Sequence, residues 1–267
     1  MKNRYINVED LKRLQLEMLV EIDKYCNEND IQYSLAYGTL LGAVRHQGYI
    51  PWDDDIDIMM LRDDYDKFLS EFRAPNMEPL SCQKSKSYFL PFAKIVRTDT
   101  VMEEDVCIKS EMGVYIDVFP IDTLPSHKIC RKFLLALKRL LNSIYQFKVV
   151  RLSSHRSLLK NIILGVGKLL FKPITMHRLL AGMESLSRVY AGKPSSYCGP
   201  IADVDKTSSN VFAKDLFTSY TDLQFEGLQF KAISSYDVWL RQVYGNYMVL
   251  PPVDKRVSHH LFKAYWK

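Results

Sequence analysis

Apolar residues at helical spacing begin the chain. Leu11, Leu14, Met18, Ile22 and Tyr25 recur every three or four residues, with Glu and Lys between them. This period is typical of a helix that packs one face on a core. The pattern therefore predicts an amphipathic helix over residues 8–29.

Short apolar runs follow this helix and predict strands rather than further long helices. The expected strands cover residues 31–36, 56–61, 91–98 and 113–120, with a helix over 63–72. Two of these strands are interrupted by a single acid, Asp57 in one and Asp117 in the other. A carboxylate between apolar neighbours needs a partner. If the two strands are adjacent, the two side chains meet, whereas Asp122, beyond Pro120, has the sequence context of a turn.

The middle of the chain has the pattern of helices over residues 128–148 and 157–171. The second helix is apolar but carries Lys160 and Lys168. It is shorter than the roughly 20 apolar residues that a spanning helix needs. A basic amphipathic helix in the membrane interface fits this pattern. A helical subdomain packed on the core, with its charges solvated, fits it equally.

Composition indicates a folded globular protein of 267 residues, 47% hydrophobic and 25% charged. The five cysteines are scattered without Cys-x-x-Cys spacing, which favours a reducing compartment over a disulfide framework. The N-terminus lacks the apolar stretch of a signal peptide. We therefore expect a cytoplasmic protein, peripheral on the inner face of the cell membrane.

Charge is distributed unevenly. Residues 123–183 contain twelve Lys and Arg but no Asp or Glu, so the net charge of +5 leaves −7 for the rest. Such segregation predicts a partner of one charge. An anionic membrane surface is expected to bind residues 123–183. No nucleic-acid partner is expected, because no groove-reading motif accompanies the charge.

An acidic cluster precedes the strand over residues 56–61. Four aspartates fall within five positions, at Asp53, Asp54, Asp55 and Asp57. Alternation along a strand places Asp55 and Asp57 on one face. With Asp117 they would form a carboxylate site for one or two Mg²⁺ ions, for which Mn²⁺ can substitute. An EF-hand calcium loop fits poorly, because its required glycine is replaced by Ile58. A cluster of solvated aspartates without a metal is a further alternative.

Polar residues on both sides of this cluster are candidates for phosphate binding. Gly38 and Thr39 follow the strand over 31–36, and Thr39 is expected to cap a helix whose free N–H groups cradle phosphate. Lys94 and Arg97 are either phosphate contacts or solvated surface charges. Near the C-terminus, Arg256 or His259 is placed to reach a nucleotide.

The ordered motifs resemble the LicD family of phosphocholine transferases, which fukutin-related proteins share. The resemblance rests on residues 38–45, Gly48, residues 50–57 and 116–120, and it continues at 225–227, 239–240 and 244–252. It implies an α+β fold with a nucleotidyltransferase (polymerase-beta-like) core, a small mixed sheet flanked by helices, and a basic helical insertion. The corresponding division is 1–122 for the catalytic core, 123–200 for the basic helical segment and 201–267 for a part that completes the core.

The resemblance also implies an activity: transfer of phosphocholine from CDP-choline to a sugar hydroxyl of a teichoic acid or lipopolysaccharide precursor, releasing CMP. Asp55, Asp57 and Asp117 would bind metal, and Asp117 or Asp55 would accept the hydroxyl proton. Donor binding would use Gly38, Thr39, Arg45, Lys94 and Arg97, with Trp52, Tyr37, Tyr33 or Tyr115 facing choline. Another CDP-linked phospho-alcohol, an Asp-x-Asp glycosyltransferase and an inactive membrane scaffold are the alternatives.

Overall fold

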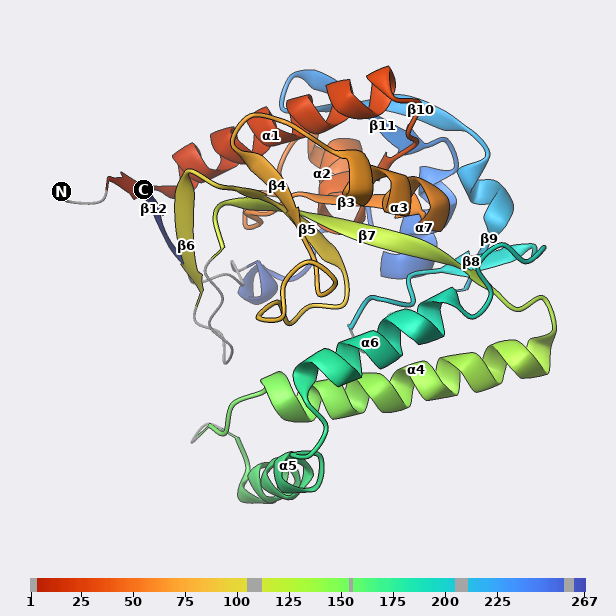
Figure 1. The fold of residues 1–267 in the computed structure, drawn as a ribbon. Coiled ribbons are helices and arrows are strands. Elements are labelled where there is room, and N and C mark those ends of the chain that lie inside the picture. The colour runs from red at the N-terminus through yellow and green to blue at the C-terminus, as the bar shows by residue number, and fades with distance from the viewer. Residues whose placement is uncertain (1–3, 105–111, 154–155, 205–210, 257–261) are drawn as a thin grey trace.

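A computed structural model describes residues 4–104, 112–153, 156–204, 211–256 and 262–267 (Figure 1). This part of the chain contains seven α-helices and a mixed set of strands, so the fold is α+β as predicted. The helices are α1 Val8–Glu28, α2 Tyr37–His46, α3 Arg62–Glu71, α4 Lys128–Val149, α5 Leu158–Leu170, α6 Met176–Arg188 and α7 Tyr236–Tyr244. The strands are β1 Tyr5–Ile6, β2 Ser34–Leu35, β3 Asp57–Leu61, β4 Met77–Leu80, β5 Ala93–Arg97, β6 Thr100–Glu104, β7 Tyr115–Leu124, β8 Tyr197–Gly199, β9 Phe212–Ala213, β10 Tyr220–Phe225, β11 Leu228–Ile233 and β12 Phe262–Trp266.

The central sheet has the strand order β2-β3-β7-β5-β4, and β8 and β9 extend it beside the end of β7. Its two middle strands, β3 and β7, are parallel, while β2, β5 and β4 join antiparallel. The buried runs Ile58–Met60 and Ile116–Phe119, apolar except for Asp117, explain this central position, because strands covered on both faces are mostly apolar. The adjacency of the two acid-bearing strands, on which the sequence prediction depended, is thus present.

Strand β7 is longer than expected, because it continues through Pro120 to Leu124. Pairing with β5 ends at Val118 and pairing with β8 begins at Asp122, so Pro120 falls in the gap between two ladders. A proline is tolerated there because no partner needs its missing N–H. The prediction of Asp122 as a turn residue was therefore wrong: it lies within β7 and is almost fully buried.

Helices cover both faces of the sheet (Figure 1). Helix α1 buries Leu11, Leu14, Met18 and Ile22, which confirms the predicted amphipathic helix. Each such side chain contributes about 1.5–3 kcal/mol when fully removed from water. On the opposite side lie α4 and α6, with α5 at the end of this pair. We call α4, α5 and α6 the helical arm; α4 and α5 confirm the two predicted helices, and α6 was not predicted.

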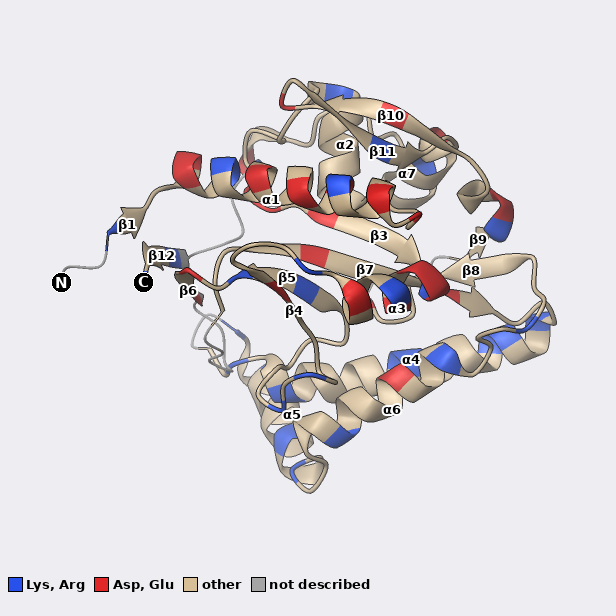
Figure 2. Cartoon of the chain, turned by 45° about the horizontal axis from the view of Figure 1, so that its top comes forward, with Lys and Arg blue, Asp and Glu red and all other residues tan. Residues whose placement is uncertain are grey.

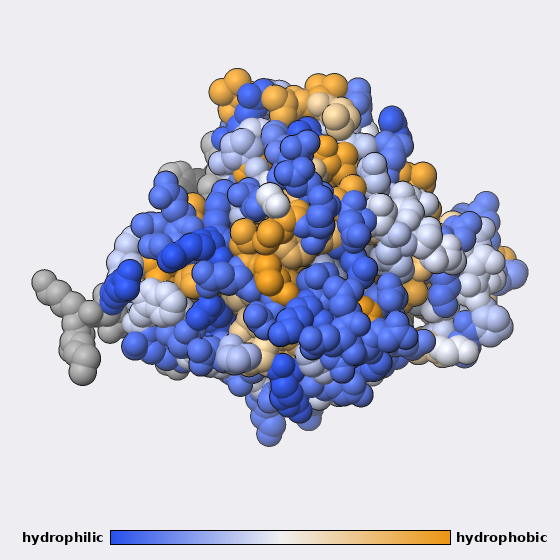
Figure 3. All heavy atoms as spheres, turned by 90° about the horizontal axis from the view of Figure 1, so that it is seen from above, coloured by the Kyte–Doolittle hydropathy of each residue, from blue (hydrophilic) through white to orange (hydrophobic). Residues whose placement is uncertain are grey.

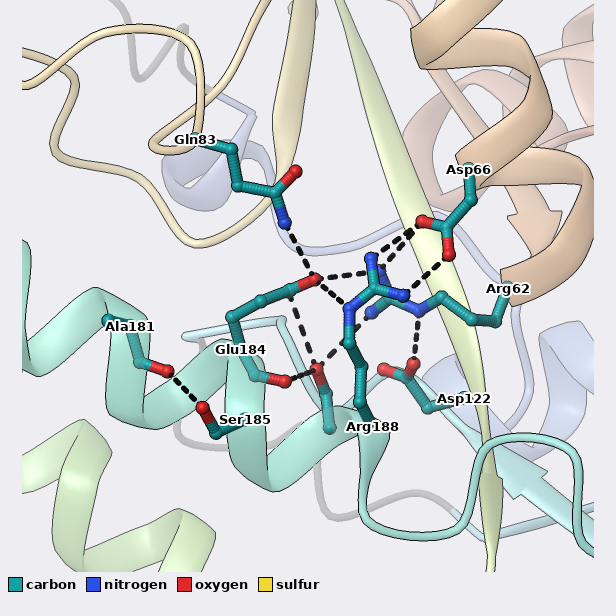
Figure 4. Close-up of polar contacts among 9 residues, drawn as sticks. Arg62, Asp66, Gln83, Asp122, Ala181, Glu184, Ser185 and Arg188 are labelled. Atoms are coloured by element: carbon teal, nitrogen blue, oxygen red, sulfur yellow. Dashed lines mark hydrogen bonds and ion pairs between the residues drawn. The ribbon is translucent and has the colours of Figure 1, made fainter.

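Figure 2 shows Lys and Arg along α4, α5 and α6, and the sequences of these helices contain one acid, Glu184 of α6. A polar network fastens α6 to the core (Figure 4). Arg62 of α3 donates to Asp122 at 2.7 Å and to Glu184 at 3.3 Å, and Arg188 pairs with Asp66. No helix in the described ranges is long and apolar enough to cross a membrane.

Candidate active site

Three charged side chains form one row across the central sheet. Asp57 of β3 is the register partner of Asp117 of β7, and Asp117 is the register partner of Lys94 of β5. Register partners on adjacent strands lie about 4.8 Å apart and project to the same face. All three are at least 92% buried. The row therefore places two carboxylates and one ammonium side by side in a largely dry part of the sheet.

The environment of Asp57 opposes its ionisation. Burial raises the pKa of Asp57 well above its usual value, and the carboxylates of Asp55 and Asp117 raise it further. Lys94 acts in the opposite direction. This arrangement is costly unless a cation or a proton relieves it, and such groups concentrate at functional sites.

Asp55 lies just outside the strand, because β3 begins at Asp57. The strand-alternation argument therefore does not extend to it, although its charge is the largest neighbouring influence on the pKa of Asp57. Asp55 is half-buried and Asp54 is buried. The acidic loop is thus folded against the protein, which disfavours the alternative of a solvated cluster.

The first turn of α2 holds the backbone at the start of the row. The N-cap of this helix is Ala36, so the prediction of Thr39 as N-cap was wrong. Thr39 is instead buried inside the first turn, and its hydroxyl accepts the backbone N–H of Asp57 at 2.8 Å. A Cβ atom at Gly38 would lie 2.5 Å from Oδ2 of Asp53, so only glycine lets this carboxylate approach the helix start.

Tyr37 has a backbone conformation that is unfavourable for a bulky residue, with a φ of 40°. Its hydroxyl donates to Asp203 at 3.0 Å, and its ring packs edge-on against Phe119 and Trp239. These contacts hold the strained turn that leads into Gly38 and Thr39. Strain of this kind is retained where the surroundings determine it, often at functional sites.

The two predicted phosphate-binding cations of β5 lie in different places. Lys94 donates to Asp117 at 2.5 Å and its ammonium lies 3.2 Å from the ring centre of Tyr115. Arg97 is three residues further along β5, where its guanidinium pairs with Asp99 at 2.7 Å and with Glu17 at 3.6 Å. The structure thus brings Lys94 to the carboxylate row and does not bring Arg97 there.

Arg45 and Trp52 lie beside the C-terminal segment. Arg45 donates to the carbonyl oxygen of Tyr247 at 2.6 Å, and burial and nearby Arg256 lower its pKa. Arg256 in turn lies over the ring of Trp52 at 5.6 Å. Two guanidinium groups and an indole therefore converge from distant parts of the chain. His259 lies outside the described residues.

Tyr244, at the end of α7, also faces the acidic cluster. Burial of its hydroxyl and the charges of Asp57, Asp53 and Asp55 raise its pKa. Sequence reasoning placed Tyr244 in a family-like segment without a role. The pattern of α7 gave no sign that its last turn returns to β3, because this proximity depends on long-range packing.

A metal ion would find two carboxylates in the row and a third close by. Among the described residues, no group of three or more His, Cys, Asp or Glu side chains is disposed to hold one ion. The third position of the row is Lys94, which already neutralises part of the charge on Asp117. The donor set still fits Mg²⁺, which is commonly held by one or two carboxylates and completed by substrate phosphates.

Comparison with known proteins identifies relatives of this chain. Residues 30–131 match the LicD/FKTN/FKRP nucleotidyltransferase domain. The chain is 29% identical over 265 residues to the lipopolysaccharide cholinephosphotransferase LicD of Haemophilus influenzae, covering 96% of this chain and 97% of that protein. An uncharacterized protein of Rickettsia typhi is 39% identical over 70 residues, which is 25% of this chain and 23% of that protein. The matched residues include α2, β3 and β7, and therefore the row of Asp57, Asp117 and Lys94.

Proposed function

The chain belongs to the LicD/FKTN/FKRP nucleotidyltransferase family, and from this premise we propose that it transfers phosphocholine from CDP-choline to a sugar hydroxyl of a lipopolysaccharide or teichoic acid precursor. The observation that carries the proposal is the register pairing of Asp57 with Asp117 inside the matched domain. The near full-length similarity to a cholinephosphotransferase supports the choice of the transferred group. The proposal includes a polymerase-beta-like core and a peripheral position on the inner face of the membrane.

In the proposed reaction, the acceptor hydroxyl oxygen attacks the phosphorus atom that carries choline. The bond between this phosphorus and the bridging oxygen breaks, and CMP leaves with the electron pair. The hydroxyl proton passes to a carboxylate. We assign this role to Asp55 or Asp117, two of the carboxylates whose charges act on Asp57. Positioning and charge stabilisation are the main catalytic contributions in phosphoryl transfer.

We infer that Asp57 and Asp117, with Asp55 nearby, hold Mg²⁺. When bound, the ion would neutralise phosphate oxygens of the donor. Adding a proton or binding a cation relieves the same repulsion, since Asp55 and Asp117 together disfavour ionised Asp57. The role of Thr39 is to fix the backbone of Asp57 through its hydroxyl, and the role of Lys94 is to orient Asp117.

Choline is a quaternary ammonium, which aromatic faces bind better than hydrogen-bonding groups do. Tyr33 is fully buried and its hydroxyl donates to Asp23, and the ring of Tyr115 already contacts the ammonium of Lys94. Trp52 is partly exposed and already has the Arg256 guanidinium over its ring. We therefore assign choline recognition to Trp52 and to Tyr244, which is 43% exposed.

A panel of donors tests this function. The full chain is mixed with Mg²⁺ and CDP-choline, CDP-glycerol, CDP-ribitol or a UDP-sugar, and thermal stability and nucleotide release are followed. A ligand that binds the folded chain raises its melting temperature. We expect CDP-choline to raise it and to release CMP. Stabilisation by CDP-glycerol or CDP-ribitol alone would transfer the assignment to those donors. A response to the UDP-sugar alone would indicate a glycosyltransferase, and no response would favour a scaffold.

A further inference from the structure

Helix α5 has an apolar face that no other part of the described chain covers. Its members, each between 52% and 77% exposed, are Leu158, Leu159, Ile162, Ile163, Val166, Leu169 and Leu170. At about 100° per residue these seven positions fall within an arc of about 140° of the helix. We call them the α5 face. So many large apolar side chains on one exposed helix are unusual unless a partner covers them.

The opposite side of α5 is occupied by contacts that hold the helix in place. Leu164 and Gly167 are its buried residues. A Cβ atom at Gly167 would lie 2.3 Å from the ring of Phe147 in α4, so glycine permits close packing there. Lys148 donates to the carbonyl oxygen of Phe171 at 3.0 Å. The helix is therefore docked on α4 through one side, and the α5 face points away from that contact.

Cations border the α5 face. Lys160 is exposed on α5, and Arg156 and Lys172 lie at the two ends of the helix, whereas Lys168 lies toward α4 and donates to the carbonyl oxygen of Lys148 at 3.4 Å. No Asp or Glu occurs between residues 123 and 183. The face seen from the α1 side, away from the arm, is by contrast mostly hydrophilic (Figure 3). The α5 face is thus an apolar surface with cations at its ends and no acid in the surrounding stretch of sequence.

We propose that the α5 face docks on an anionic lipid bilayer, with its apolar side chains in the interface and the bordering cations on the headgroups. A helix of this composition binds through apolar burial together with attraction to anionic lipids. A second copy of the chain is a poorer partner, because a symmetric contact would bring like charges together. Nucleic acid would satisfy the cations but leave the apolar face in water.

This proposal deepens the peripheral membrane position included in the proposed function. Vesicle flotation of the full chain tests it without any donor or turnover, so its failure is distinguishable from a failure of the proposed phosphocholine transfer. The probes are vesicles of phosphatidylcholine alone and of phosphatidylcholine with 30% phosphatidylglycerol. We expect binding to the anionic vesicles only. The triple variant Leu159→Gln, Ile163→Gln and Leu170→Gln should lose most of it, while Val8→Gln, Val20→Gln and Val238→Gln, at exposed positions on α1 and α7, should retain it.

Charge reversal gives a second test of the proposal. Lys160→Glu with Lys172→Glu should weaken partitioning by about tenfold or more, since each cation near an anionic surface contributes on the order of fivefold. Lys24→Glu with Lys86→Glu is the matched control outside the arm. Binding of the Gln variant at the wild-type level, or no binding of the wild type, would overturn the proposal. A dimer in light scattering that the Gln substitutions dissociate would assign the face to a second copy instead.

Discussion

Thr39 shows how a single hydroxyl positions the proposed site. Its oxygen accepts the N–H of Asp57, both residues are buried, and the acceptor comes from a helix whereas the donor begins a strand. Thr39→Val keeps the shape and removes the acceptor, so the N–H of Asp57 loses its partner. We expect a loss of about 1–3 kcal/mol in unfolding free energy and a lower kcat for CMP release. Thr39→Ser keeps the hydroxyl, so its unfolding free energy in urea and its kcat for CMP release should match those of the wild type. A Thr39→Val variant with wild-type values of both quantities would contradict this role.

Trp52 is the residue at which donor specificity should be set. Trp52→Ala removes the partly exposed indole that we assign to choline, so KM for CDP-choline should rise by about tenfold, from a cation–π contribution of about 1–2 kcal/mol. KM for CDP-glycerol, which lacks the ammonium, should change little. Steady-state CMP release with both donors checks this. An equal rise for both would indicate that Trp52 only supports the local fold.

Residue chemistry was most predictable where a charge interrupts an apolar strand. Asp57 and Asp117 could be selected because burial of a lone carboxylate demands a partner. The ionic partner of Asp117, Lys94, was instead predicted to be a phosphate contact or a surface charge, because its burial depends on the pairing of β5 with β7. Arg97 and Tyr244 show the same limit. Their neighbours come from distant segments that no local pattern connects.

At the scale of elements, β7 connects the site to the helical arm. One end of the strand carries Asp117 and the other carries Asp122, which pairs with Arg62 of α3 beside Glu184 of α6 (Figure 4). Burial raises the pKa of Asp122 to about 7, and Arg62 opposes this shift. The folded chain therefore binds this proton more tightly than the unfolded chain does.

The linkage predicts a pH dependence of stability. Because the folded pKa is about 7 and the unfolded value 3.8, the stabilisation is fully present below about pH 4 and is lost as pH rises through 7. Asp122→Asn lacks this titration. The difference in unfolding free energy, wild type minus variant, should thus fall between pH 5 and pH 8 in urea titrations. Asp222→Asn, exposed on β10, is the control; a difference that rises with pH would contradict the assignment.

Long elements with a clear period could be predicted, as α1, α4 and α5 show. Strand β7 was cut short because Pro120 is usually a strand terminator, and only its place between two ladders explains why pairing resumes at Asp122. Helix α2 was expected to start at Thr39, whereas it begins at Tyr37 with a positive φ. Tertiary contacts of Tyr37, not local capping, determine that start.

At the scale of the whole molecule, the arm and the core should unfold together. The ion pairs of Arg62 and Arg188 join α6 to α3 and β7. All three tryptophans, Trp52, Trp239 and Trp266, lie outside the arm, so fluorescence reports on the core whereas far-UV circular dichroism includes the arm helices. We expect coincident urea transitions from the two probes. A loss of circular dichroism signal at lower urea than the fluorescence change would show that the arm unfolds as an independent subdomain, as the predicted segment over residues 123–200 anticipates.

The most direct test of the central claim compares CMP release from CDP-choline, with Mg²⁺ and an acceptor glycan, by the wild type and by single aspartate variants. Asp57→Asn and Asp117→Asn should each lower kcat by at least about a hundredfold while the far-UV spectrum stays unchanged, because each removes one carboxylate of the row. Asp222→Asn should turn over at the wild-type rate. Retained turnover in either row variant would contradict the assignment of β3 and β7 as the catalytic centre.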